Sequence, residues 1–176
     1  KFQEIDKDAY IKLLDIIFNI LTNFDQEIVN QPIKINASIC LKKLIEKGSY
    51  SLFDSDLVEK ILDIIYMVFS NESELSPDLY RELHYVMLKS LYEYSESFCD
   101  KIFKITEIGF NDENISFKII SYNFWSLICK FEADFDISET NRLNITGHYV
   151  EQLINYGIQL ISSIDPYDKY FLSDSE

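Results

Sequence analysis

The chain has 176 residues, of which 47% are hydrophobic and 15% aromatic, so it can fold around a substantial core and is not a disordered segment. Lysine and arginine total 16 against 30 aspartates and glutamates, and the net charge of -14 opposes direct binding to nucleic acid. With only four glycines and three prolines, the composition favours long regular elements over hairpins.

Apolar residues recur at helical spacing along almost the whole chain and predict seven helices. Pro32 marks the beginning of the second helix and Gly48 its end. Ser76-Pro77-Asp78 supplies an N-cap, a proline at the first helical position and an acid in the first turn of the fourth. The predicted helices cover residues 8–23, 33–47, 56–70, 77–94, 97–110, 115–131 and 149–164, with an irregular stretch at 134–146.

The spacing of these helices predicts an all-α chain built from pairs. The first members of the pairs start near residues 8, 56, 97 and 149, close to the roughly 40–47-residue period of HEAT and armadillo repeats. Several helices are apolar on more than one face, as expected for helices between the neighbours of a stacked array. A compact helical bundle accounts for the same periodicity equally well, so this pattern leaves both architectures open.

The cysteines and the apolar runs restrict the setting of the protein. Cys40, Cys99 and Cys129 are widely spaced within apolar helical patterns, which predicts core thiols in a reducing compartment and supports neither a zinc site nor a disulfide framework. No secretory leader is recognised, and no apolar run reaches the ~18 residues of a membrane span. The abrupt start at Lys1 indicates a piece of a longer protein.

The residue types that carry catalysis are isolated from one another. His84 lies within the fourth predicted helix and His148 at the start of the seventh, and neither has a Ser/His/Asp or Cys/His pattern beside it. The acidic pairs Asp54/Asp56 and Glu132/Asp134 have the spacing of loop and cap residues. We therefore interpret both histidines as structural and expect no enzymatic activity, no metal site and no cofactor.

Four stretches in consistent order resemble the importin-β family of nuclear transport receptors. Residues 115–136 resemble the family helix that carries a Phe-Trp-Ser triplet (Phe124-Trp125-Ser126) followed by a cysteine and acids. Residues 33–56 are similar to the helix whose Lys, Ala-Ser/Thr and Leu pattern leads into a Phe-Asp linker, and residues 102–113 to the helix before the tryptophan helix. Residues 149–165, followed by Ser-Asp-Ser-Glu, look like the helix that leads into the family's acidic loop.

This resemblance implies an α-α superhelix of HEAT repeats five to seven plus the first helix of repeat eight, about three and a half helix pairs. In that family, grooves between neighbouring first helices on the convex side accept Phe-Gly repeats of nucleoporins. The positions carried over for nucleoporin binding are Leu13, Ile17, Ile61, Leu62, Phe98 and Ile105.

The same resemblance places the tryptophan helix on the concave side, where the family meets the GTPase Ran. The Ran-facing positions carried over are Asn123, Lys130, Glu132 and Asp134. The family has acids at the two positions that Asn123 and Lys130 occupy here. Trp125 is assigned mainly to packing, because Phe124 and Leu127 have the pattern of core residues.

The function that the resemblance implies is nuclear import by binding alone. The expected partners are nucleoporin Phe-Gly repeats, Ran-GTP, and importin-α or basic cargo segments, without direct nucleic-acid binding or membrane insertion. The expected location is the cytoplasm and nucleus, including the nuclear pore. A basic segment suits the acidic chain, although acidity that only keeps the chain in solution is an equally good account of the charge. The alternative is a HEAT scaffold subunit that positions an enzyme, such as a phosphatase.

Overall fold

The structure is a computed structural model, which describes residues 7–25, 27–47, 54–71, 75–91, 95–134 and 145–164. Within these ranges every regular element is an α-helix, so the predicted all-α class is confirmed. The helices are α1 (Lys7–Leu21), α2 (Gln31–Lys47), α3 (Ser55–Asn71), α4 (Pro77–Leu91), α5 (Ser95–Phe110), α6 (Ile115–Asp134), α7 (Ile145–His148) and α8 (Val150–Ser163).

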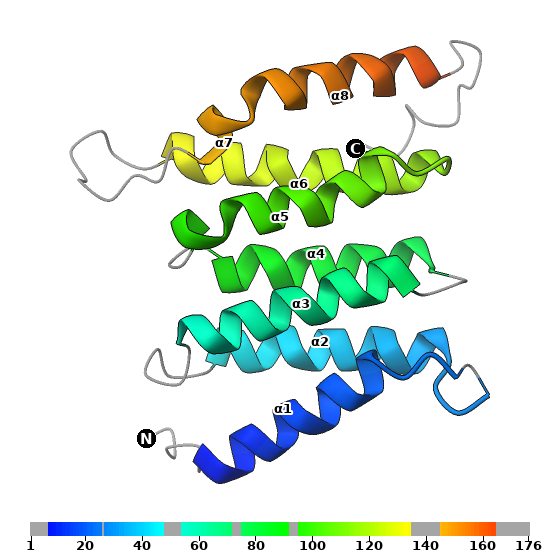
Figure 1. The fold of residues 1–176 in the computed structure, drawn as a ribbon, viewed down its shortest axis with the longest axis vertical. Coiled ribbons are helices and arrows are strands. Elements are labelled where there is room, and N and C mark those ends of the chain that lie inside the picture. The colour runs from blue at the N-terminus through cyan, green and yellow to red at the C-terminus, as the bar shows by residue number, and fades with distance from the viewer. Residues whose placement is uncertain are drawn as a thin grey trace.

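The helices pack as consecutive pairs that stack in one direction (Figure 1). Helix α1 packs on α2, α3 on α4 and α5 on α6, while α8 packs on α6 and begins a fourth pair. A first layer contains α1, α3, α5 and α8, and a second layer contains α2, α4 and α6. Because α1 and α8 lie at opposite ends, the molecule is an open stack of the kind that helical repeats form and not a closed bundle.

The core lies between the two layers and repeats from one pair to the next. Buried Ile61, Leu62 and Leu83 of the second pair correspond to buried Ile102, Phe103 and Phe124 of the third. Each residue and its counterpart are 41 positions apart (61 to 102, 62 to 103, 83 to 124). This shared register means that α3–α4 and α5–α6 present equivalent faces to their neighbours.

Trp125 lies at the centre of an aromatic cluster that joins the third pair to α7–α8. The indole is only 2% exposed, and its Nε1 donates a 2.9 Å hydrogen bond to the buried hydroxyl of Thr106. The rings of Phe103 and Tyr149 stack at 4.2 Å between centroids, and each lies about 5.5 Å from the indole. The predicted packing role of Trp125 is therefore confirmed.

Both ends of the stretch predicted to be irregular are helical, because α6 runs on to Asp134 and a short helix, α7, begins at Ile145; residues 135–144 lie outside the described residues. The carboxylate of Glu132 is 3% exposed and accepts hydrogen bonds from the backbone N–H groups of Ile145, at 2.5 Å, and Thr146, at 3.2 Å. The Thr146 hydroxyl also donates to this carboxylate. Glu132 thus fixes the start of α7 on the end of α6.

The three cysteines differ in how far the fold buries them. All three are thiols without a disulfide, but Cys40 and Cys129 are exposed and only Cys99 is half-buried. The prediction that all three are core residues is wrong for Cys40 and Cys129, whose side chains are exposed on α2 and α6.

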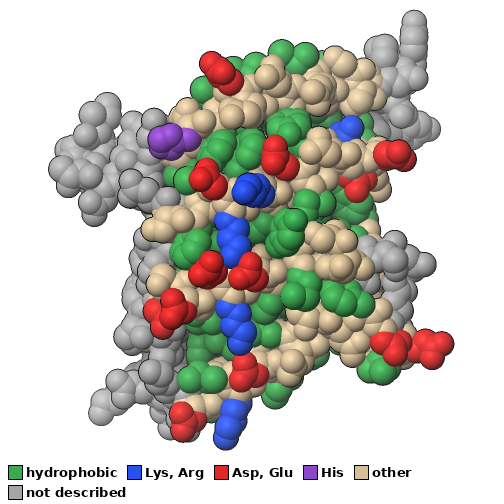
Figure 2. All heavy atoms as spheres, in the orientation of Figure 1, with side chains coloured by type: hydrophobic (Ala, Val, Ile, Leu, Met, Phe, Trp, Pro, Cys, Tyr) green, Lys and Arg blue, Asp and Glu red, His purple; other side chains and the backbone are tan. Residues whose placement is uncertain are grey.

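Charged side chains link the first-layer helices to one another. Lys60 on α3 pairs with Asp15 on α1 at 3.4 Å, and Lys101 on α5 pairs with Asp63 on α3 at 2.6 Å. Figure 2 shows lysines and acids alternating in a column across this face. Most of these groups are well exposed, and surface pairs contribute only about 0–1 kcal/mol each, so these pairs add little to the stability of the stack.

None of the described helices combines the length and the apolar character needed to span a membrane.

Candidate functional site: a slot between α4 and α6

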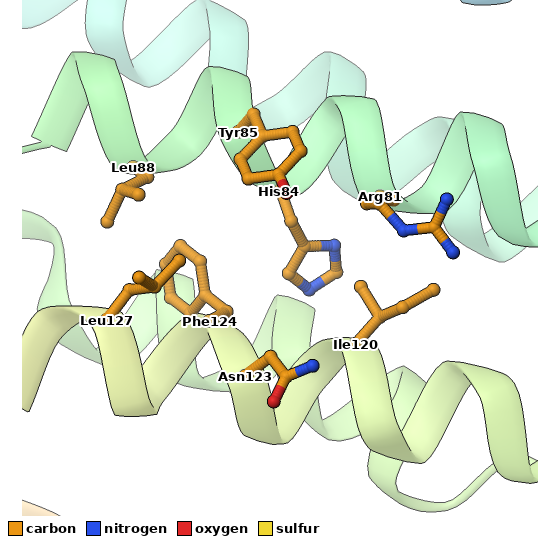
Figure 3. Close-up of a pocket in the computed structure, with 8 residues that line it drawn as sticks. All are labelled: Arg81, His84, Tyr85, Leu88, Ile120, Asn123, Phe124 and Leu127. Carbon is orange, nitrogen blue, oxygen red and sulfur yellow. The ribbon is translucent and has the colours of Figure 1, made fainter. Parts of the chain in front are cut away.

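The second layer contains a small slot where α4 and α6 pass one another (Figure 3). It encloses about 70 Å³. Arg81, His84, Tyr85 and Leu88 line it from α4, and Ile120, Asn123, Phe124 and Leu127 line it from α6. Apart from His84, the floor of the slot is apolar, and further polar groups lie at its rim.

His84 is the polar group at the floor of this slot. Its Nδ1 lies 2.8 Å from the carbonyl oxygen of Tyr80. The ring stacks on Phe69, with centroids 5.4 Å apart, and meets the edge of Phe124. In Figure 3 the imidazole points from α4 toward α6, at the level of Ile120 and Asn123.

The protonation state of His84 follows from its burial. The residue is 3% exposed, and desolvation lowers the pKa of its imidazole from 6.5 to about 4, so the ring is neutral at physiological pH. Because a carbonyl oxygen only accepts hydrogen bonds, the single ring proton lies on Nδ1, which donates to Tyr80. Nε2 is therefore an acceptor, and it has no hydrogen-bond partner among the described residues.

Charged side chains surround the rim of the slot, and most of them are paired with a neighbour of opposite charge. The Arg81 guanidinium donates to Asp78 at 2.8 Å, and Lys42 on α2 donates to Glu82 at 2.9 Å. The ammonium of Lys42 also lies 5.1 Å from the centroid of the Tyr85 ring, which is 37% exposed. The rim therefore extends the slot toward α2 as a mixed aromatic and polar surface. This arrangement can hold a side chain that is apolar but carries one N–H or O–H donor.

Of the Ran-facing positions carried over from the resemblance, Asn123 and Lys130 are seven positions apart on one face of α6, whereas Glu132 lies on the opposite face. Asn123 lines the slot and is exposed, and Lys130 is exposed farther along α6. Glu132 is buried against α7, so its side chain does not face outward as a Ran-facing position would. Asp134 is the last residue of α6, and its side chain lies outside the described residues.

The nucleoporin-binding positions carried over from the resemblance do not border an open groove. Leu13 is exposed and Phe98 is half-buried, but Ile17, Ile61, Leu62 and Ile105 belong to the core. The expectation that these positions line a surface groove for a phenylalanine ring is therefore wrong for Ile17, Ile61, Leu62 and Ile105. The physical reason is that Ile61 and Leu62 face the space between the layers, where neighbouring helices cover them completely.

The sequence pattern predicted a structural role for His84 and did not predict the slot beside it. The residue occupies a core position of α4, with Leu83, Val86 and Met87 buried around it. A polar ring at a core position is the feature that could have drawn attention to it. Its unsatisfied Nε2 depends on the packing of α6, which the sequence does not reveal.

The described residues hold no group of three or more His, Cys, Asp or Glu side chains arranged to bind a metal ion. Comparison of the chain with protein-family models, curated proteins and solved structures finds no match.

Proposed function

We propose that this chain is a helical-repeat binding module that takes up a protein segment along the second layer, with one side chain of that segment inserted between α4 and α6. The observation that carries the proposal is the buried Nε2 of His84, an acceptor without a partner among the described residues, beneath an apolar slot. Because Nε2 itself is closed to solvent, the proposal requires the side chains that line the slot to move aside when a donor binds.

The energetics favour a ligand group that carries a donor. A buried acceptor left without a hydrogen bond costs about 1–3 kcal/mol, and a donor from a bound segment removes that cost. Burial of the apolar part of the inserted side chain contributes roughly 25 cal/mol for each Å² of surface removed from water. A cavity of about 70 Å³ holds only the tip of one side chain, so further affinity must come from contacts at the rim. The net charge of -14 favours a segment with basic residues.

Within this class, the specific function that we propose is nuclear import, with Ran-GTP and basic cargo or importin-α as partners. This narrower proposal rests on the resemblance of residues 115–136, and a HEAT scaffold subunit is the alternative. Binding of purified Ran tests it: the import receptor retains Ran-GTP and not Ran-GDP, whereas a scaffold retains neither.

A displayed peptide library tests the broader proposal without assuming a partner. Peptides selected on the wild-type protein are measured against Asn123→Trp, which fills the slot from its exposed rim, and against Asn155→Trp, which adds the same ring on the exposed face of α8. The proposal requires at least a tenfold loss of affinity for Asn123→Trp and none for Asn155→Trp. Equal affinity for all three proteins rejects the slot as the binding site.

A further inference from the structure

The two layers of the stack differ in charge. The first-layer helices α1, α3, α5 and α8 contain nine acids and five lysines, whereas the second-layer helices α2, α4 and α6 contain five acids and eight lysines and arginines. The second layer therefore has an excess of three positive charges within a chain whose net charge is -14. Salt screens the charge of the whole chain beyond roughly 8–10 Å, so a segment that touches the second layer responds mainly to the charges of that layer.

A lysine occurs at the same repeat position in each second-layer helix. The buried residues of these helices align with a shift of 46 positions from α2 to α4 and of 41 positions from α4 to α6. Two buried series show this register: Ser38, His84 and Trp125, and Leu41, Met87 and Ile128. The same two shifts relate Lys43 of α2 to Lys89 of α4 and to Lys130 of α6. These three residues are the lysine row, which crosses the second layer once per helix.

The lysine row is not neutralised by the described part of the chain. The side chains of Lys43 and Lys130 are exposed, and neither has an ion-pair partner among the described residues. Lys60 and Lys101 of the first layer, by contrast, are paired with acids of neighbouring helices. The described acids of the second-layer helices are already engaged in contacts of their own; they are Glu46, Asp78, Glu82 and Glu132.

The lysine row lies along the side of the stack and not at its end. A further helix pair would follow α6 and α8 in the direction in which the pairs already stack, and would leave the outer faces of α2 and α4 uncovered (Figure 1). Continuation of the array therefore supplies no cover for this surface, and its free charges call for carboxylates from elsewhere. We infer that the lysine row is a docking surface for an extended acidic segment of a partner protein.

The spacing of the helices defines the sequence of this acidic segment. Packed helices lie about 8–10 Å apart, and an extended chain advances roughly 3.3 Å per residue. A segment that crosses α2, α4 and α6 therefore meets one lysine at about every third residue, so its aspartates or glutamates should recur at that spacing. Segments rich in like charges repel themselves and remain extended, which suits this geometry. Contacts between exposed charges are individually weak, so the complex is weak and exchanges readily.

The test uses a defined probe, a fluorophore-labelled peptide of 12 residues with glutamate at every third position and glycine and serine elsewhere. Its control peptide has glutamine in place of each glutamate. The variant Lys43→Glu/Lys130→Glu reverses two charges of the lysine row. Lys12→Glu/Lys104→Glu reverses two lysines of the first layer that are likewise exposed and unpaired among the described residues. Both variants lower the net charge by four, so repulsion by the whole chain is matched between them.

Fluorescence anisotropy measures the affinity of each protein for each peptide. The inference requires that the glutamate peptide bind Lys43→Glu/Lys130→Glu at least five times more weakly than Lys12→Glu/Lys104→Glu, and that the glutamine peptide bind neither. Equal affinity for the two variants, or no binding to the wild type at millimolar peptide, overturns the inference and leaves the lysines as charges that suit the C-terminal ends of their helices.

Urea unfolding of the same variants tests whether an acidic stretch of this chain occupies the lysine row. If it does, Lys43→Glu/Lys130→Glu is less stable than Lys12→Glu/Lys104→Glu, and the inference of a partner protein is overturned. Equal stability of the two variants is the result that the inference requires. Because the probe peptide has no apolar side chain, its binding does not depend on the α4–α6 slot, so the failure of this inference and the failure of the proposed function are distinguishable.

Discussion

The hydroxyl groups of Tyr80 on α4 and Ser121 on α6 lie 2.7 Å apart in a buried hydrogen bond that joins the second helix pair to the third. Gly109 of α5 makes room for this bond, because a Cβ atom at that position would lie 2.0 Å from the Tyr80 hydroxyl oxygen and 2.4 Å from the Ser121 Oγ. Burial raises the pKa of Tyr80, so its hydroxyl stays protonated and available as a donor.

Gly109→Ala should therefore destabilise the protein. Glycine to alanine inside a helix normally stabilises by roughly 0.5–1 kcal/mol, but here the new methyl group forces Tyr80 and Ser121 apart at a cost of about 1–3 kcal/mol. Urea unfolding measures the change in the free energy of unfolding. Gly157→Ala is the matched control, since its Cβ would meet only the end of the exposed Tyr122 side chain, at 3.0 Å, which can move aside. A Gly109→Ala protein at least as stable as Gly157→Ala would contradict this packing.

His84 should make stability depend on pH. Its folded pKa, about 4, lies below its ordinary value of 6.5, so between these values the unfolded chain binds the proton more readily and stability falls as pH falls. At about 1.4 kcal/mol per pKa unit, the wild type loses up to roughly 3 kcal/mol between pH 6.5 and 4 relative to His84→Phe. Unfolding of both proteins in urea across this range isolates the contribution of the histidine. Parallel pH profiles for the two proteins would show that His84 is not held neutral.

Trp125 should be sensitive to both cavity formation and loss of its hydrogen bond. Trp125→Ala is expected to cost about 3–5 kcal/mol, as large-to-small core changes do. Thr106→Val leaves the indole N–H unpaired in the core, at about 1–3 kcal/mol. A double-mutant cycle of Thr106→Val with Trp125→Phe measures the coupling, which we expect to exceed 0.5 kcal/mol in magnitude, as is typical of contacting residues. Purely additive costs would mean that this hydrogen bond does not stabilise the fold.

Glu132 should hold α7–α8 on the rest of the stack. Glu132→Ala removes the acceptor for two backbone N–H groups of α7, at about 1–3 kcal/mol for each buried donor left unsatisfied. Hydrogen exchange should then accelerate in α8 while exchange in α2 stays at its wild-type rate. Glu132→Gln retains one acceptor oxygen, so its exchange rate in α8 should lie between those of the wild type and Glu132→Ala. Uniform acceleration in both helices would assign Glu132 to global stability instead.

The helices were predictable because their apolar periodicity and terminal residues act locally. The predicted first members starting near 8, 56, 97 and 149 lie within two residues of the observed starts of α1, α3, α5 and α8, and Pro77 begins α4 as predicted. α7 was not predictable, because its start depends on Glu132, which reaches it across thirteen positions of sequence.

The candidate site depends on contacts between pairs, which periodicity does not specify. A rotation of the helix by less than one turn decides whether an apolar residue faces its own partner helix or an open groove. Ile61 and Leu62 illustrate this, since their sequence pattern fits either environment and only the packed stack shows them to be core. The unpartnered Nε2 of His84 likewise results from the position of α6 relative to α4.

The most direct test of the binding proposal observes His84 itself. The chain has two histidines, and His148 is exposed and lies outside the slot, so ¹⁵N-histidine labelling gives a simple NMR spectrum with an internal control. A peptide selected on the wild-type protein is titrated to saturation at pH 7. We predict that the Nε2 resonance of His84 moves as this atom accepts a hydrogen bond, while the resonances of His148 stay in place. Unchanged His84 resonances at saturation would contradict the proposal that the α4–α6 slot receives a side chain of the bound segment.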